Sequence, residues 1–160
     1  MMHIILGWGI AAILVLATIG IHYEIMKIVS DLVVPWALRR FHDRRVMMLM
    51  IVTLMLGHIA EIWTFAFAMY AVSNMGGLGH VTGNIDQGLN AYAYFSAVTY
   101  TSLGYGDIVP HGVMRAISVS EALAGLLMLA WSASFTYLKM EQIWNLRLWN
   151  LRRDAKGRAD

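Results

Sequence analysis

Three long apolar segments, separated by charged or glycine-rich stretches, dominate the pattern of hydrophobic and polar positions along this chain. The first covers residues 4–21, the second residues 46–73 and the third residues 114–138. Each is close to or above the ~20 apolar residues that a helix needs to cross a bilayer. The pattern therefore predicts three transmembrane helices. The first is expected to continue to residue 34, and the second is long enough to tilt.

The composition agrees with a membrane protein of one domain. Of the 160 residues, 59% are hydrophobic and 14% are charged, which is too few charges to cover a soluble globule. The absence of cysteine excludes disulfides, iron–sulfur clusters and thiolate metal sites. A secretory signal peptide is a weaker interpretation of the first segment, because no basic leader precedes its apolar run.

The basic residues flank the apolar segments unevenly and so predict an orientation. One group surrounds the first connection (Lys27, Arg39, Arg40, Arg44 and Arg45), and a second lies in the tail (Lys139, Arg147, Arg152, Arg153, Lys156 and Arg158). Only Arg115 lies elsewhere. Because cytoplasmic loops carry the excess of Lys and Arg, we expect the N-terminus outside, the C-terminus in the cytoplasm and the loop 74–113 outside.

Two basic stretches leave their local structure open. Residues 35–45 mix aromatic and basic side chains and are expected to form an interfacial linker, more simply an ordinary connection than a gating element. The tail, residues 139–160, repeats apolar side chains at helical spacing. It either extends the third helix into a cytoplasmic bundle or lies on the membrane surface.

A polar, glycine-broken segment at residues 101–107 lies between the second and third apolar segments. Irregular backbone at membrane depth must be shielded by protein or must line water. Gly104 and Gly106 permit dihedral angles in which successive carbonyls point the same way. Before this segment, residues 89–101 predict a helix of about 20 Å, which is too short to cross and must re-enter. The negative end of its dipole then points to the membrane centre, where it favours a cation.

This part of the chain resembles the potassium channel pore-domain family. The family's filter pattern is Thr-Val-Gly-Tyr-Gly-Asp, and here Ser-Leu-Gly-Tyr-Gly-Asp occupies residues 102–107. Residues 94–101 resemble the family's pore helix and residues 108–110 its exit loop. Arg115, Glu121 and Gly125 lie where small bacterial members often place Arg, Glu and the inner-helix glycine. The resemblance covers residues 46–138.

The resemblance implies an all-α membrane protein of three transmembrane helices with a re-entrant pore helix, assembled as a homotetramer in the bacterial inner membrane. Residues 1–34 would add an extra transmembrane helix to the pore domain. The pore domain would comprise an outer helix (46–73), a turret (74–88), a pore helix (89–101), a filter (102–106) and an inner helix (114–138). Its function would be passive conduction of K⁺, without catalysis, cofactor or nucleic acid, and with membrane lipids and further copies of the chain as partners.

For the site, the resemblance implies that the backbone carbonyls of the filter bind K⁺, with support from Asp107, Tyr94 and Thr101. The binding residues would be Ser102, Leu103, Gly104, Tyr105 and Gly106. Ser102 in place of Thr keeps the hydroxyl but loses the β-branch that restricts its rotamer. Some members carry a Glu where this chain has Val98, so a tyrosine such as Tyr94 is the expected partner of Asp107. A weakly selective cation channel and a non-conducting membrane subunit remain alternative functions.

Three ionisable residues lie inside the apolar segments: His58, Glu61 and Glu121. Glu61 lies about 22 Å from the inner start of its segment and Glu121 about 12 Å from the outer start of its own, so both should reach the level of the pore helix. We expect them to brace that helix, or to be paired interior groups without effect on conduction. A metal or haem site is less well supported, because His22 is expected nearer the cytoplasm than His58 and no second His–Glu pair exists.

Gating is the least constrained property of the sequence. No apolar segment carries arginines at every third position, which excludes a voltage sensor of that type. Gly125 serves either as a hinge of the third helix or, as we favour, as a site of close packing.

Overall fold

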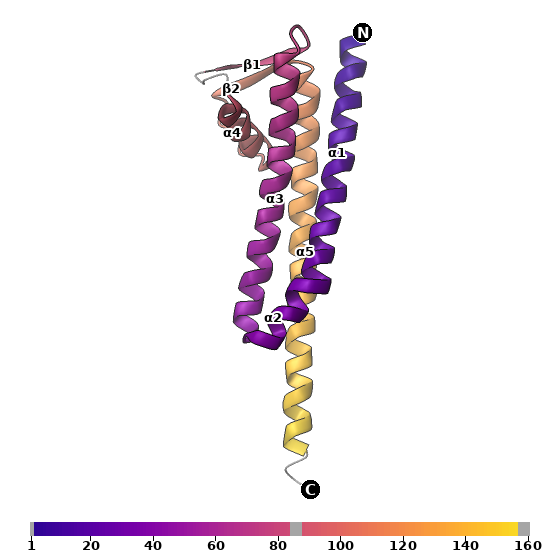
Figure 1. The fold of residues 1–160 in the computed structure, drawn as a ribbon, viewed down its shortest axis with the longest axis vertical. Helices are drawn as coiled ribbons and strands as arrows, with labels where there is room; N and C mark the ends of the chain where they lie inside the picture. Colours follow the sequence, from indigo (N-terminus) through magenta and orange to yellow (C-terminus); the bar gives the residue numbers. More distant parts are fainter. Residues whose placement is uncertain (1, 84–87, 157–160) are drawn as a thin grey trace.

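Three long helices run side by side and place the two chain ends at opposite ends of the molecule (Figure 1). The computed structural model describes residues 2–83 and 88–156, and side chains through residue 145. The helices are α1 (Met2–Ile28), α3 (Asp43–Asn74) and α5 (Met114–Lys156). Within the described residues, the helical stretches Met2–Arg40, Asp43–Asn74 and Met114–Asn145 are long and apolar enough to cross a membrane. The prediction of a mostly helical protein with three membrane-spanning helices is confirmed.

The first helix continues through the region assigned to the linker 35–45. A π-helical turn, η1 (Val29–Val33), leads into α2 (Val34–Arg40), which ends at Phe41 before α3 begins at Asp43. Pro35 lies in the first turn of α2, directly after η1, and removes one backbone N–H donor at this junction. Residues 35–40 of the predicted linker are thus helical, and α2 turns across the lower end of the bundle (Figure 1).

A small β-sheet replaces part of the predicted turret and the predicted exit loop. Strand β1 (Gly79–Gly83) pairs antiparallel with β2 (Ile108–Gly112), with Gly79 opposite Gly112 and Val81 opposite Pro110. Gly79 allows this pairing, because a Cβ there would lie 2.8 Å from the carbonyl oxygen of His111. The structure therefore adds one small two-stranded sheet to the mostly helical fold that was predicted. Residues 84–87 of the predicted turret and 157–160 of the tail lie outside the described residues.

The short helix α4 (Leu89–Tyr100) lies between the two strands in sequence and packs against α3 and α5. The sequence predicted a helix over residues 89–101. Its buried side chains join a core that includes Phe65, Met69, Tyr92, Phe95 and Ile117. A second core near α2 contains Met26, Val29, Val46 and Met50. These two cores leave a polar layer between them, where the buried charged groups lie.

Helix α5 is unbroken from Met114 to Lys156 and extends beyond the other helices (Figure 1). Of the two interpretations of the tail, this continuity favours an extension of the third helix over a helix lying on the membrane surface.

Candidate functional site

The first backbone N–H groups of the segment 101–107 point back to the C-terminal end of α4. The N–H of Ser102 donates to the carbonyl oxygen of Thr99 at 2.9 Å, and the N–H groups of Leu103 and Gly104 donate to that of Val98 at 2.9 and 3.1 Å. In the described part of the chain, no hydrogen bond ends on a carbonyl of residues 102–106. These residues are also exposed on the single chain. Their carbonyls are therefore free to bind a ligand or ion.

Along this segment, residues with positive φ alternate with residues that do not have positive φ. The φ angle is +56° at Ser102, +48° at Gly104 and +79° at Gly106, whereas Leu103 and Tyr105 between them are not in this region. Alternation of left- and right-handed residues turns successive peptide groups to one side. Ser102 is the one non-glycine residue with positive φ in the described chain, a conformation that costs about 1–3 kcal/mol in a non-glycine residue.

Asp107 and Tyr94 form a hydrogen bond at the C-terminal end of the segment 101–107. The Tyr94 hydroxyl donates to Oδ2 of Asp107 at 2.9 Å, and both side chains are exposed on the single chain. This hydrogen bond, with the nearby carboxylate charge, raises the pKa of the Tyr94 hydroxyl. Thr101 behaves differently, because its hydroxyl donates to the carbonyl of Ala97 in its own helix at 2.8 Å.

Two buried carboxylates contact the opposite face of α4. Glu61 of α3 accepts a hydrogen bond from the Tyr100 hydroxyl, and its Oε1 lies 2.8 Å from Nδ1 of His22. Glu121 of α5 is hydrogen-bonded to the hydroxyl of Ser96, which also lies 2.7 Å from the carbonyl oxygen of Ile62. Both carboxylates are fully buried. Two polar side chains of α4, Ser96 and Tyr100, thus connect it to α3 and α5.

His22 and His58 lie side by side, contrary to the depth expected from the sequence. Their ring centroids are 5.2 Å apart, and His22 is buried. The prediction that His22 lies nearer the cytoplasm than His58 is wrong. It placed His22 at the inner end of the apolar run 4–21, whereas α1 continues to Ile28 and is followed by η1 and α2, so His22 lies well inside the first helical stretch. His58 also approaches the Tyr100 hydroxyl through Nδ1, at 2.9 Å.

Gly125 lies where α5 crosses the end of α4. A Cβ at this position would collide with the carbonyl of Tyr100, which is backbone and not free to move aside. Helix α5 continues without interruption through this position. The contact is close packing of a helix against the residue that precedes the exposed segment.

The structure brings two pairs of the predicted site residues into contact. Tyr94 meets Asp107, and His58 meets Glu61, with 3.5 Å between Nδ1 and Oε2. Sequence reasoning missed the roles of Ser96, Tyr100 and Ser132. A signal existed for the first two, because hydroxyl side chains four residues apart share one face of a helix. Ser132 is one of several hydroxyls in α5, and nothing in the sequence distinguishes it.

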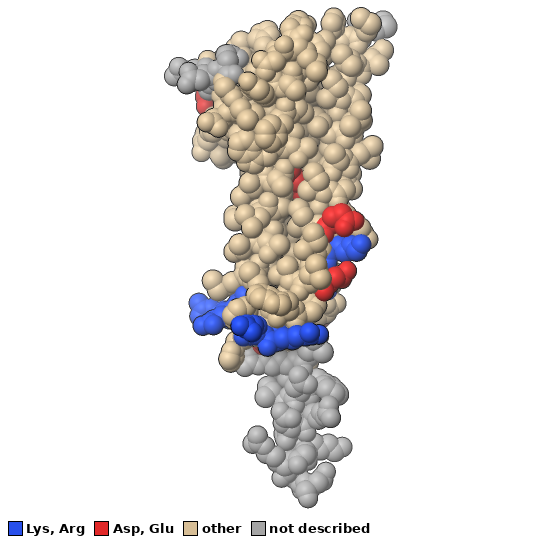
Figure 2. Space-filling view, viewed as in Figure 1, with Lys and Arg blue, Asp and Glu red and all other residues tan. Residues whose placement is uncertain are grey.

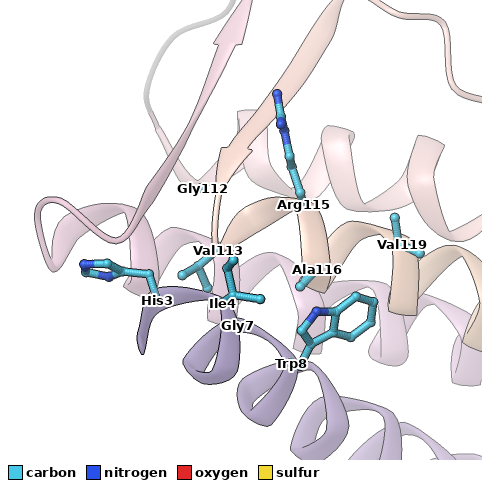
Figure 3. A pocket seen from close by; sticks show the side chains of 9 residues that line it. All are labelled: His3, Ile4, Gly7, Trp8, Gly112, Val113, Arg115, Ala116 and Val119. Atoms are coloured by element: carbon cyan, nitrogen blue, oxygen red, sulfur yellow. The ribbon is translucent and has the colours of Figure 1, made fainter. Parts of the chain in front are cut away.

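A separate pocket of about 370 Å³ lies between the N-terminal end of α1 and the start of α5 (Figure 3). Its lining includes Trp8, Val113 and Arg115. The side-chain Nε of Arg115 donates to the carbonyl of Pro110 at 3.2 Å. None of residues 101–107 lines this pocket, so it is distinct from the exposed segment.

Comparison with known proteins places these features in a family. A 35-residue stretch is 51% identical to Protein LctB of Bacillus caldotenax and 49% identical to Protein LctB of Geobacillus stearothermophilus, covering 22% of this chain and 26% of each relative. The match therefore spans about a quarter of the length of these curated relatives. No solved structure matches the chain. The family model described as an ion channel matches residues 46–142, which is more than half of the chain, and the protein therefore belongs to the ion channel family.

Proposed function

We propose that this protein is a subunit of a homotetrameric, potassium-selective channel whose filter is formed by residues 102–106. The observation that carries the proposal is the set of carbonyls in this segment, exposed and without hydrogen-bond partners in the described chain. A ring of backbone carbonyls replaces the hydration shell of K⁺. The alternating sign of φ at Ser102, Gly104 and Gly106 supports carbonyls that face a common side.

The tetramer is the assembly that the resemblance to the potassium channel pore-domain family implies. One chain supplies one wall, and further copies around an axis would complete the ring. Exposed apolar side chains near this wall support assembly, because Leu103, Tyr105 and the α5 residues Leu123, Leu126 and Leu127 are exposed on the single chain. Contacts between subunits and with lipid would cover them. In this assembly α4 is the re-entrant pore helix, and its C-terminal dipole favours the cation.

The orientation is part of the proposal. Lysine and arginine side chains gather over the lower part of the helices, on the face that Figure 2 shows. The described members are Lys27, Arg39, Arg40, Arg44, Arg45 and Lys139. This distribution supports a cytoplasmic lower end. The sheet, α4 and the filter would then lie toward the outside of the bacterial inner membrane.

The three ionisable residues named from the sequence are proposed to brace α4. Glu61 holds it through Tyr100, His58 contacts the same hydroxyl, and Glu121 holds it through Ser96. Since Tyr100 directly precedes the exposed segment, these bonds would fix the position from which the filter starts.

A weakly selective cation channel is the second candidate. The observation that favours it is Ser102, which adopts φ of +56° without the β-branch of threonine. Its hydroxyl would then be less restricted at the innermost ion site, and discrimination between K⁺ and Na⁺ would fall.

The test is uptake of ⁸⁶Rb⁺ into proteoliposomes, with block by Ba²⁺. We expect uptake by the wild-type protein and its loss in Gly104→Ala, because this glycine has φ of +48°. Gly9→Ala is the matched control, since a Cβ at Gly9 of α1 meets nothing within 4 Å. If the reconstituted protein takes up no ⁸⁶Rb⁺, the proposal that it conducts K⁺ is wrong. If the protein is a monomer or dimer in detergent, the proposed ring of carbonyls cannot close. Reversal potentials in K⁺ and Na⁺ gradients decide between the two selectivities.

A further inference from the structure

A cluster of three metal-ligating side chains lies buried behind α4. His22 of α1 and His58 and Glu61 of α3 each offer one ligand atom, and these atoms lie within 4.8 Å of one another. The exposed fraction is 1% for His22, 0% for Glu61 and 14% for His58. Two hydroxyls complete the cluster, from Tyr100 of α4 and Ser132 of α5.

The hydrogen bonds of this cluster do not close when Glu61 is ionised and both histidines are neutral. Nδ1 of His22 must then donate to Glu61, because a carboxylate only accepts. The Tyr100 proton also goes to Glu61, so Nδ1 of His58 must donate to the Tyr100 oxygen. Both Nε2 atoms are left as acceptors.

Both acceptors face the same hydroxyl. Nε2 of His58 lies 3.1 Å and Nε2 of His22 lies 3.3 Å from Oγ of Ser132. A serine hydroxyl has one proton and two lone pairs. It can therefore satisfy only one of the two ring nitrogens as a donor, whereas it can accept from both. These distances allow an arrangement in which two Nε2–H groups donate to the Ser132 oxygen, and this arrangement leaves the two Nδ1 atoms for a cation.

We propose that a divalent transition-metal ion of the Zn²⁺ class binds Nδ1 of His22, Nδ1 of His58 and the carboxylate of Glu61. With the metal on both Nδ1 atoms, both Nε2–H groups donate to Ser132, and every ring nitrogen has a partner. Metal-ligating histidines usually donate their other N–H to an oxygen in this way, which fixes the tautomer and the ring orientation. The Tyr100 hydroxyl continues to donate to the second oxygen of Glu61.

The donor set fits this class of metal. Two imidazoles and one carboxylate, without sulfur, are typical of zinc sites with three protein ligands and one open position. Ligand atoms around a tetrahedral Zn²⁺ lie roughly 3.3–3.5 Å apart, given metal–ligand distances near 2.0–2.1 Å. The measured separations from the two Nδ1 atoms to Glu61 oxygens are 2.8 and 3.5 Å. Binding therefore requires Nδ1 of His22 and the Glu61 oxygen to move apart by about 0.5–0.7 Å, whereas the separation of Nδ1 of His58 from Glu61 already fits.

An entry path reaches the cluster. His58 and Ser132 line a groove of about 480 Å³ between α3 and α5, together with Thr136 and Met140. His58 is the partly exposed member of the three ligands and so faces the arriving ion. The metal would join α1, which precedes the residues matched to the ion channel family, to α3 beside the end of α4.

The test uses the untagged full-length protein in detergent, since a histidine tag would itself bind metal. The protein is equilibrated with Zn²⁺, dialysed against metal-free buffer and analysed by elemental mass spectrometry. We expect about one Zn²⁺ per chain in the wild type and background levels in His22→Asn and Glu61→Gln. His80→Asn is the matched control, because His80 lies in the sheet, stacked on His111, and should leave the stoichiometry unchanged.

A second variant keeps all three ligands, so its result does not depend on whether the protein still folds when a ligand residue is replaced. Ser132→Ala removes the shared acceptor and should weaken Zn²⁺ affinity by about 10–100-fold. Bound Co²⁺ should show the visible absorption of a four-coordinate nitrogen–oxygen site, and Glu61→Gln should abolish it. Wild-type protein that retains no metal overturns the site. Retention in His22→Asn or Glu61→Gln, or unchanged affinity in Ser132→Ala, overturns the proposed ligands.

Discussion

The two faces of α4 form hydrogen bonds of the same chemical kind in opposite surroundings. On the buried face, Ser96 and Tyr100 direct hydroxyls at the buried carboxylates Glu121 and Glu61. On the exposed face, the Tyr94 hydroxyl donates to Asp107, which is open to solvent on the single chain. Low dielectric strengthens a hydrogen bond and also makes an unpaired polar group costly. The buried face should therefore determine stability, and the exposed face mainly the position of the segment 101–107.

The two buried carboxylates differ from each other as well. Glu61 meets donors on both of its oxygens, as an ionised carboxylate requires. Glu121 meets only Ser96, and its Oε2 is a buried side-chain oxygen without a partner in the described chain. Ser96 has one proton but two acceptors in reach, the Ile62 carbonyl and Glu121. A protonated Glu121 would satisfy both contacts, so we expect a charged Glu61 and a neutral Glu121.

The largest effect is expected from removing the charged group of the buried face. Glu61→Ala leaves the N–H of His22 and the hydroxyl of Tyr100 without an acceptor, so the free energy of unfolding should fall by about 3–5 kcal/mol. Thermal and denaturant unfolding in detergent, with a chelator present to exclude metal effects, measure this. Glu24→Ala, at an exposed acidic position of α1, should change little. Equal effects of the two substitutions would contradict the role of Glu61.

A pair of isosteric substitutions tests the assigned charges. Glu61→Gln introduces an amide N–H₂ against donors and should cost about 1.5–3 kcal/mol, the usual range for hydrogen bonds to charged groups. Glu121→Gln replaces a neutral carboxyl by a neutral amide that still donates to Ser96, and should cost under about 1 kcal/mol. The same unfolding measurements compare them. A larger loss in Glu121→Gln than in Glu61→Gln would reverse the assignment.

The same pair tests whether these groups brace the filter. Ion flux in liposomes should be slower or less selective in Glu61→Gln, because the bond to Tyr100 at the start of the segment weakens. Unchanged rate and selectivity in both variants would reject bracing.

An intermediate effect is expected at the hydroxyl that joins α4 to Glu61. Tyr100→Phe keeps the ring in the core and removes one donor from Glu61 and one acceptor from His58. The loss should be about 1–3 kcal/mol, because a buried partner remains unsatisfied. Tyr92→Phe, also in α4, offers a comparison away from Glu61. A loss at Tyr100 no greater than the loss at Tyr92 would count against a special role of the Glu61 cluster.

The smallest effect on stability is expected on the exposed face. Tyr94→Phe removes the bond to Asp107 and should leave the unfolding curve nearly unchanged, while it alters K⁺ over Na⁺ selectivity measured by reversal potential. The raised pKa of Tyr94 also predicts how the hydrogen bond depends on pH. The bond contributes fully below the ordinary pKa of tyrosine, and its contribution is lost as the pH rises through the raised pKa. The two proteins should therefore differ at neutral pH and converge at strongly alkaline pH.

The sequence by itself determined the features that depend on local composition. The three spanning helices follow from runs of apolar residues near the length of a bilayer. The exposed segment was visible because Gly104 and Gly106 break a helix pattern at membrane depth, and the family resemblance rested on contiguous residues there. Tyr94 was named as a partner for Asp107 from the family resemblance, because Val98 occupies the position where some members carry a Glu.

Only the tertiary structure decided which distant residues meet. The pairing of β1 with β2 joins segments on either side of α4, and no local pattern encodes that register. His22 lies beside His58 because the first helical stretch continues through η1 and α2 before α3 returns along it, which sets the depth of the α1 residues relative to α3. A periodic pattern reports the face of a helix but not its axial offset from a neighbour, and that offset placed two histidines and a carboxylate around one point.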